Sequence, residues 1–354
     1  MRIPKKALFI ASLLIGIAAF LCIPLFVGIE EVWSIIRAVG WLGIILFCVN
    51  SALILVAPAI GWKILIDKDG QTVPLISLLK ANIMGYPINF VAPSMYLGSE
   101  PLRVFYIADI HNLPKRKVLA SVIVNKFQEL AGLVFLCLIG TIIIVCSGGL
   151  SQGETISIIV AISIIALVLI AMLYAFLSNF KPVLKTVNIL SKLKLFSSKI
   201  EGMRHKAEEL ENMVREHFIK RWKTYLNSQL ITLVSAASVF IRPIIFYYFY
   251  NKNILIETQL FTLLTKLFII YVLTQIVLVF QLTPGGFGTF EGGMILTFQI
   301  AGLGSGSAEA IAFSIITRIG ELAMVFAGLW MISHYGLMKV AKGKEDTNNA
   351  EKLS

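Results

Sequence analysis

Long apolar stretches separated by short polar segments dominate the chain. Six of these stretches are long enough to cross a lipid bilayer, because about 20 apolar residues span a hydrocarbon core of about 30 Å. They cover residues 7–28, 41–66, 118–148, 155–178, 224–250 and 307–336. The pattern therefore predicts six membrane-spanning helices.

Two further apolar regions, 74–112 and 258–304, are interrupted by proline and glycine. The first contains APSMYLGSE at 92–100, and the second contains TPGGFGTFEGG at 283–293. The apolar piece after the first interruption, 100–110, would form a helix only about 16 Å long, which is about half the hydrocarbon thickness. We therefore expect two re-entrant helical hairpins, each entering and leaving the membrane on the same side.

The two interrupted regions resemble each other in sequence. In each, a proline precedes a glutamate, Glu100 or Glu291, by seven positions. A basic residue then follows after 26 or 27 positions and opens a similar apolar stretch, KFQELAG at Lys126 and RIGELAM at Arg318. Two ordered matches at nearly equal spacing predict an internal repeat, with the first copy at about 7–148 and the second at about 155–336.

The distribution of charge predicts the orientation of the chain in the membrane. Only 14% of the 354 residues are charged and 57% are hydrophobic, whereas about a quarter of the residues in a soluble domain are charged. With the N-terminus in the cytoplasm, 24 of the 31 Lys and Arg residues fall in cytoplasmic segments, two fall outside and five lie within the membrane. This positive-inside distribution predicts cytoplasmic termini and an inverted relation between the two repeats.

Residues 1–336 are therefore expected to form a single integral domain of the cytoplasmic membrane, an all-α polytopic fold. The basic segment 179–223 within it is either an amphipathic helix at the inner surface or an ordinary solvated loop. Residues 337–354 are polar, and we expect a disordered cytoplasmic tail there. The net charge of +11 follows from the positive-inside pattern, so we expect no nucleic-acid partner.

The sequence predicts no catalytic residue, metal site or cofactor. The four cysteines lie in apolar runs without a C-x-x-C spacing, and the four histidines form no cluster with the spacing of metal ligands. No phosphate-binding loop of the Walker type is present.

The motifs at the two interruptions resemble the transmembrane region of the lysylphosphatidylglycerol synthases. The resemblance rests on GSEPLR at 98–103, the Lys126 and Arg318 stretches, and PGGFGTFE at 284–291, and it spans roughly 7–336. Ser99 separates Gly98 from Glu100, which are adjacent in the family pattern, and Lys126 stands where that pattern usually has arginine. The second motif matches well.

Well-known members of this family, the multiple peptide resistance factors, join a lipid-flipping membrane domain to a cytosolic domain that transfers an amino acid from tRNA to phosphatidylglycerol. The present chain continues for only 18 residues after its last apolar run. The resemblance therefore implies the flippase part alone, acting on an anionic phospholipid, an aminoacyl-phospholipid or a polyprenyl-phosphate-linked lipid.

A site for such a headgroup within the membrane requires cations for phosphate, carboxylates for amines or protons, and glycines that allow close approach to the backbone. The candidate residues are Arg103, Lys126 and Arg318 as cations, Glu100, Glu129, Glu291 and Glu321 as carboxylates, and Pro284, Gly285, Gly286 and Gly288 in the second interruption.

Each part of this site has a structural alternative. Lys126 with Glu129, and Arg318 with Glu321, have the i,i+3 spacing of an ion pair within one helix. Glu291 has the position of a carboxylate that accepts hydrogen bonds from the first amides of its own helix. The sequence leaves these alternatives open.

The leading hypothesis is thus a lipid translocase, whose partners are membrane lipids. The rival hypothesis is a membrane-embedded transferase, or the partner of one, that moves an aminoacyl group or a polyprenyl-linked sugar. A third is a non-catalytic membrane protein that docks through segment 179–223. A homodimer and a complex with a lipid-modifying enzyme are both compatible with the sequence.

Overall fold

The computed structural model describes residues 5–67, 72–92, 98–178, 181, 184–185, 200–281, 283–303 and 306–352. Helices account for nearly all of them, and no strand occurs in these ranges. The helices are α1 (Lys5–Val27), α2 (Ile29–Ile66), α3 (Leu75–Val91), α4 (Glu100–His111), α5 (Lys115–Ser147), α6 (Gln152–Leu177), α8 (Ile200–Ile219), α9 (Trp222–Tyr250), α10 (Lys252–Glu257), α11 (Leu260–Val279), the 3-10 turn η1 (Pro284–Gly286), α12 (Thr289–Ala301) and α13 (Ser307–Lys352). The prediction of an all-α polytopic membrane protein is confirmed.

Six of the described helices are long and apolar enough to cross a membrane: α2, α5, α6, α9, α11 and the part of α13 up to Gly336. Five of them coincide with expected spans. The sixth, α11, falls in the region expected to be a hairpin, and the expected first span corresponds to α1, whose apolar part is a shorter helix at Ala11–Val27.

Apolar side chains cover the outside of the bundle, as expected of a protein that is solvated by lipid. On α6, Ile158 and Ile162 are the buried positions, while Leu167 has 68% of its surface exposed. Soluble monomers rarely expose contiguous apolar patches of this extent. The exposed faces of these helices are therefore surfaces for the hydrocarbon chains of lipids.

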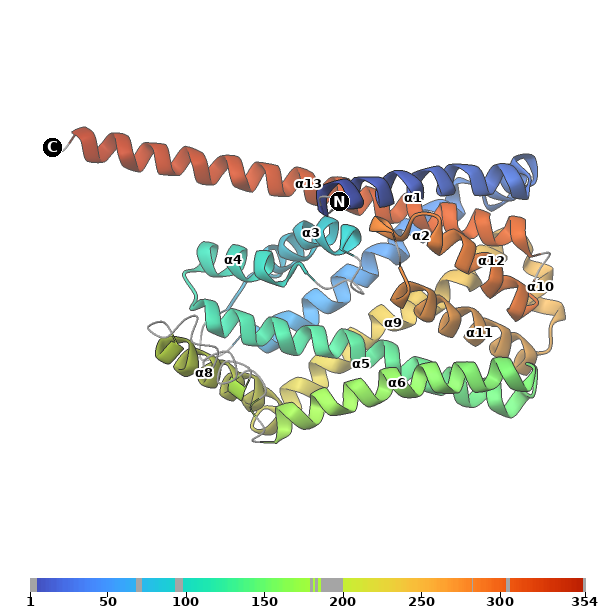
Figure 1. Cartoon of the computed structure of the whole chain (residues 1–354), viewed down its shortest axis with the longest axis horizontal. Helices are drawn as coiled ribbons and strands as arrows, with labels where there is room; N and C mark the ends of the chain where they lie inside the picture. The colour runs from blue at the N-terminus through green and yellow to red at the C-terminus, as the bar shows by residue number, and fades with distance from the viewer. Residues whose placement is uncertain are drawn as a thin grey trace.

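Helices α2 and α9 form the centre of the fold, where they pack against each other in antiparallel orientation (Figure 1). Ser228 near the start of α9 donates a hydrogen bond to the carbonyl of Gly61 near the end of α2, at 2.8 Å. Further along, Ser235 donates to the carbonyl of Ile54 at 3.3 Å. Small and hydroxylated residues at such contacts let two helix backbones approach closely within a membrane.

The remaining helices pack in matched pairs around this centre. Helix α3 packs against α13 and α11 packs against α5, while α13 also contacts α2 and α5 also contacts α9. Both outer pairs meet at a glycine: a Cβ on Gly328 of α13 would lie 2.3 Å from the carbonyl oxygen of Ile83, and one on Gly140 of α5 would lie 2.7 Å from Phe268. The broken units α3–α4 and α11–α12 consequently occupy equivalent places, near opposite ends of the bundle (Figure 1).

Each broken unit consists of two helices that pack against each other and are joined by an interruption at the expected place. The interruption of the first unit, residues 93–97, lies outside the described residues. Helices α4 and α12 contain 12 and 13 residues, so each is too short to cross a bilayer alone. Helix α11 has 20 residues, and the re-entrant path of both units stays a prediction.

Two boundaries differ from the expectation. Helix α2 begins at Ile29 and bends at Gly40, whose φ of 67° is not helical, so the expected span at 41–66 follows this bend. Helix α13 continues to Lys352, so most of the segment expected to be a disordered tail is helical in the structure. Extending a helix that is already formed costs far less than starting one, and residues 337–352 contain no proline.

The segment expected to be a connector contains the amphipathic helix α8, which packs at one end of the bundle (Figure 1). Its apolar side chains Val214 and Phe218 are buried with Leu65, Val124 and Phe127. Residues 186–199 of this segment lie outside the described residues. Helix α8 is therefore a packed element of the fold and not a solvated loop.

Candidate functional site

The second interruption positions a buried carboxylate at the start of α12. Gly285, Gly286 and Gly288 adopt positive φ values of 71°, 64° and 75°, a region that side chains other than glycine rarely occupy. The chain thereby turns through η1 and enters α12 at Thr289. Glu291 Oε2 accepts a hydrogen bond from the amide of Gly288 at 2.6 Å, which is the capping role that the sequence left open.

The other oxygen of the same carboxylate pairs with Arg318 of α13. Arg318 Nε donates to Glu291 Oε1 at 3.0 Å, and its Nη1 donates to Glu321 Oε2 at 2.8 Å. The guanidinium also lies over the rings of Phe90 and Phe290, at 5.7 and 4.7 Å from their centroids. Arg318 therefore joins three elements, α3, α12 and α13, and its side chain is buried.

The first half has a corresponding arrangement. Glu100 Oε2 accepts from the amide of Gly98 at 2.7 Å, so this glutamate binds the backbone just before α4, although α4 itself has no side-chain cap. Lys126 and Glu129 form an ion pair of 2.7 Å within α5. Arg103 of α4 differs from Arg318, because it donates to the neutral side chain of Asn125 at 2.9 Å and lies 4.5 Å from the Trp62 ring centroid.

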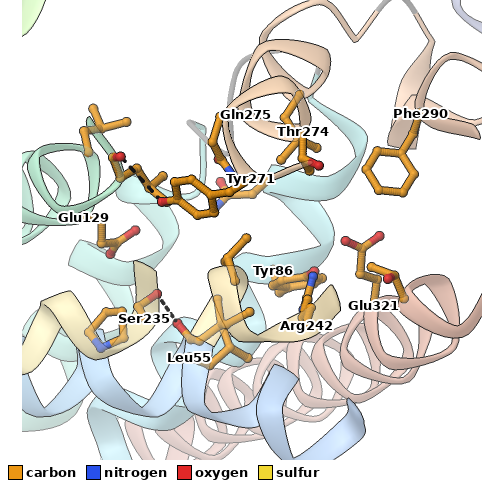
Figure 2. Close-up of a pocket in the computed structure, with 18 of the residues that line it drawn as sticks. Leu55, Tyr86, Glu129, Ser235, Arg242, Tyr271, Thr274, Gln275, Phe290 and Glu321 are labelled. Atoms are coloured by element: carbon orange, nitrogen blue, oxygen red, sulfur yellow. Dashed lines mark hydrogen bonds between the residues drawn. The ribbon is translucent and has the colours of Figure 1, made fainter. Parts of the chain in front are cut away.

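A cavity of about 170 Å³ lies between the two halves (Figure 2). One water needs about 10–15 Å³ on this measure, so the cavity has room for several waters or for a small polar group. Figure 2 shows Glu129 and Glu321 on opposite sides of the opening, with Arg242 and Tyr86 near Glu321. Its walls come from α2, α3, α4, α5, α9, α11, α12 and α13, and its polar lining includes Asn82, Tyr86, Asn89, Ser99, Arg103, Lys126, Glu129, Ser235, Arg242, Tyr271, Thr274, Gln275, Thr317 and Glu321.

Several polar atoms of this lining have no hydrogen-bond partner within the described residues. They are Asn82 Oδ1, Ser99 Oγ, Arg103 Nε and Gln275 Nε2. A buried polar group without a partner costs about 1–3 kcal/mol, so such groups are generally satisfied by water or by a ligand. The cavity thus concentrates unused hydrogen-bonding capacity from both halves of the protein.

The candidate site residues proposed from the sequence fall into two groups in the structure, those that line the cavity and those that do not. Arg103, Lys126, Glu129 and Glu321 line the cavity. The others lie behind or beside it, in the helix starts and in the ion pairs with Arg318; they are Glu100, Pro284, Gly285, Gly286, Gly288, Glu291 and Arg318. The ion pairs Lys126–Glu129 and Arg318–Glu321 both have the geometry of the structural alternative.

Sequence reasoning missed much of the neutral lining, including Asn82, Tyr86, Tyr271 and Gln275. These residues occur singly in apolar helices, and only the packing of the helices brings them together. Arg242 gave a clearer signal, since a charged residue within an apolar run marks a candidate functional site. Lys266, which carries the same signal, instead donates to the carbonyl of Gly302 at the end of α12, at 2.6 Å.

This arrangement suits the binding of a polar, charged group inside the membrane. Guanidinium and ammonium groups bind phosphate oxygens, and carboxylates bind amines or carry protons. Within the described residues, no three His, Cys, Asp or Glu side chains are placed to hold a metal ion. The chemistry that the lining offers is that of charge recognition.

Comparisons with known proteins agree with this architecture. A UPF0104 membrane protein of Methanocaldococcus jannaschii is 22% identical over 320 residues, covering 88% of this chain and 93% of the relative. Another from Methanothermobacter thermautotrophicus is 25% identical over 333 residues, covering 93% of each. No solved structure matches the chain. The profile of the lysylphosphatidylglycerol synthase TM region matches residues 9–328, and the chain therefore belongs to this family of membrane proteins.

Proposed function

We propose that the protein is a lipid translocase of the cytoplasmic membrane, in which the cavity receives the headgroup of a lipid during its passage. The observation that carries this proposal is a charged and partly unsatisfied cavity whose lining comes from both the N-terminal and the C-terminal parts of the chain. Transporters built on inverted repeats commonly bind substrate between the repeats near the bilayer midplane. The acyl chains would remain among the exposed apolar faces of the helices.

The proposed orientation places both termini in the cytoplasm. The connection between α4 and α5 and the helix α8 lie at one end of the bundle, and the α5–α6 connection and α10 lie at the other (Figure 1). Lys115, Arg116 and Lys117 and the basic residues around α8 belong to the first end. The positive-inside rule assigns that end to the cytoplasm, and the two broken units would then open to opposite sides.

A membrane-embedded transferase, or the partner of one, is the second candidate. It is favoured by one observation, the presence of Glu129 and Glu321 on opposite walls of the same cavity, since paired carboxylates are suited to acid–base work. The two candidates differ in a simple requirement: a transferase needs a donor substrate, whereas a translocase does not.

The test is reconstitution of the purified protein in liposomes that contain labelled lipid, with movement between leaflets measured without any donor. We expect transbilayer movement well above that of protein-free liposomes. Donor-dependent formation of a new lipid without movement would contradict the proposal and support a transferase.

Two variants extend this test to the charged groups. We expect Glu291→Gln to slow transport about tenfold or more while the protein stays folded, because the amide can still accept from Gly288 but loses the charge that faces Arg318. Glu257→Gln, at an exposed position on α10, is the matched control and should transport normally. Transport at the wild-type rate by Glu291→Gln would assign Glu291 to helix capping alone.

A further inference from the structure

Arg242 is a cation within the membrane domain whose partners are all neutral. It projects from the middle of α9 and lines the cavity (Figure 2). Its Nη2 donates to Ser51 Oγ at 3.0 Å, and its Nε lies 3.4 Å from Asn50 Oδ1. Both partners belong to α2, so the crossing of α2 and α9 holds two of the three guanidinium nitrogens in place.

The remaining nitrogen, Nη1, has no hydrogen-bond partner within the described part of the chain. No carboxylate oxygen of the described residues lies within 4.0 Å of the Arg242 guanidinium. By contrast, Lys126 is paired with Glu129, and Arg318 is paired with both Glu291 and Glu321. Arg242 is half-buried at the edge of the cavity, and an ionisable residue within a membrane domain usually serves an ion pathway or a substrate.

Arg103 shares this environment on another wall of the cavity. It too has no described carboxylate oxygen within 4.0 Å, and its Nε has no partner among the described residues. The charged residues of the lining are Arg103, Lys126, Arg242, Glu129 and Glu321. Lys126 pairs with Glu129, and Arg318 is shared between Glu291 and Glu321. The lining therefore holds three cations against two carboxylates, and the Arg103 and Arg242 guanidinium groups have no opposite charge in direct contact among the described residues.

We propose that Arg242 binds a phosphate oxygen of a lipid headgroup, and that the cavity therefore selects lipids of net negative charge over zwitterionic ones. This proposal rests on the proposed function, since it names the substrate class of the same cavity. A guanidinium that is already anchored at two nitrogens loses little freedom when Nη1 binds a phosphate. An amine on the headgroup would find both carboxylates of the lining already paired.

The test compares lipid binding by the full chain in detergent, with fluorescent phosphatidylglycerol as the anionic lipid and phosphatidylethanolamine as the zwitterionic one. We expect the wild type to bind phosphatidylglycerol more tightly. Arg242→Gln should weaken that binding about ten- to hundredfold, the loss of one charge-assisted hydrogen bond, and should change binding of phosphatidylethanolamine little. Arg242→Lys should recover part of the affinity, because it keeps the charge but not the fork.

Lys266→Gln is the matched control, because Lys266 is a cation of the membrane domain that contacts the end of α12 and not the cavity. It should bind both lipids as the wild type does. Equal affinity of the wild type for the two lipids, or unchanged binding by folded Arg242→Gln, would overturn the proposal. If Arg242→Gln does not fold, the unfolding temperature of the wild type is measured with each lipid instead. Equal increases of this temperature by phosphatidylglycerol and by phosphatidylethanolamine would also overturn the proposal.

A competition arm distinguishes a lipid from a free anion. Inorganic phosphate should displace the lipid only weakly, because it lacks the acyl chains that lie against the outer helices. Arg242-dependent binding of inorganic phosphate as tight as that of the lipid would overturn a lipid as the ligand. Transport in liposomes is measured separately from binding. Transport of anionic and zwitterionic lipids at equal rates would refute only this inference. Arg242-dependent binding of lipid without any transport would refute only the proposal that the protein is a translocase.

Discussion

Charged side chains of the same type have different surroundings in this protein. Glu291 uses one oxygen to cap α12 and the other to bind Arg318, whereas Glu129 and Glu321 each pair with one cation and also face the cavity. The sequence showed which apolar stretches contain ionisable residues, and the i,i+3 spacing offered the two ion pairs Lys126–Glu129 and Arg318–Glu321 as one of two open alternatives. It could not predict that Arg242 would have only neutral partners, because these come from α2, nearly 200 positions away in the chain.

The entry into α12 depends on the backbone freedom of Gly288. Its φ is 75°, and a Cβ at this position would lie 2.5 Å from the Cβ of Ala19 on α1. We therefore expect Gly288→Ala to lower the free energy of unfolding by about 1–3 kcal/mol. Thermal unfolding in detergent measures this effect.

Gly292 provides the control for this substitution, since it lies four residues further along in α12. Nothing within 4 Å would meet a Cβ there, and its φ is not positive. Gly292→Ala should leave the stability unchanged or raise it by about 0.4–1 kcal/mol, as is usual for such a change within a helix. Equal losses from the two substitutions would mean that bulk in this region, and not the conformation of Gly288, is what matters.

At the scale of elements, the length of the apolar runs predicted the long helices well and the broken ones less well. The expected spans at 118–148 and 224–250 agree with α5 and α9 within a few residues. Helix α11 is long enough to cross the membrane and also belongs to a broken unit. Its length alone therefore cannot distinguish a membrane-spanning helix from one arm of a re-entrant hairpin. The packing of α8 was also beyond the sequence, because its apolar residues fit a membrane surface and a protein surface equally well.

Helix α8 brings His217 against the end of α2. His217 Nδ1 lies 2.9 Å from the carbonyl of Met213 and its Nε2 lies 3.4 Å from Nη1 of Arg221. A neutral ring that donates from Nδ1 and accepts at Nε2 satisfies both contacts. Burial lowers the pKa of His217 below its ordinary value of 6.5, and the Arg221 charge lowers it further, while the Met213 carbonyl and Glu216 act in the opposite direction.

The sign of the resulting pH dependence follows from this shift. Because the folded protein binds a proton at His217 less readily than the unfolded chain, unfolding takes up a proton once the pH falls below about 6.5. We expect thermal stability to be unaffected by this group above that pH and to decrease as the pH falls towards the lowered pKa. Unfolding temperatures between about pH 5 and pH 8 measure it, with His217→Gln expected to be less sensitive. A similar loss of sensitivity in His205→Gln, at an exposed position, would contradict the assignment to His217.

At the scale of the whole molecule, the matched packing of α3 with α13 and of α11 with α5 places the cavity where the two halves meet. The recurrence of two short motifs at nearly equal spacing predicted an internal repeat, and this repeat stays a prediction. The shape of the cavity was not predictable, because its lining comes from eight helices whose contacts are not encoded in any one of them. Its polar residues are sparse in the sequence and become a site only in the assembled bundle.

The orientation of the two broken units can be tested by labelling. Asn112 follows α4, and Gln299 lies near the end of α12; both are exposed. Inverted hairpins place these two positions on opposite sides of the membrane, because α5 then runs outward and α13 runs inward. In a variant without Cys22, Cys48, Cys137 and Cys146, we expect a cysteine at position 112 to react with an impermeant reagent only from the cytoplasmic side, and one at position 299 only from the outside. Reaction of both from the same side would exclude inverted hairpins, and with them the alternate exposure of the cavity on which the proposed translocation depends.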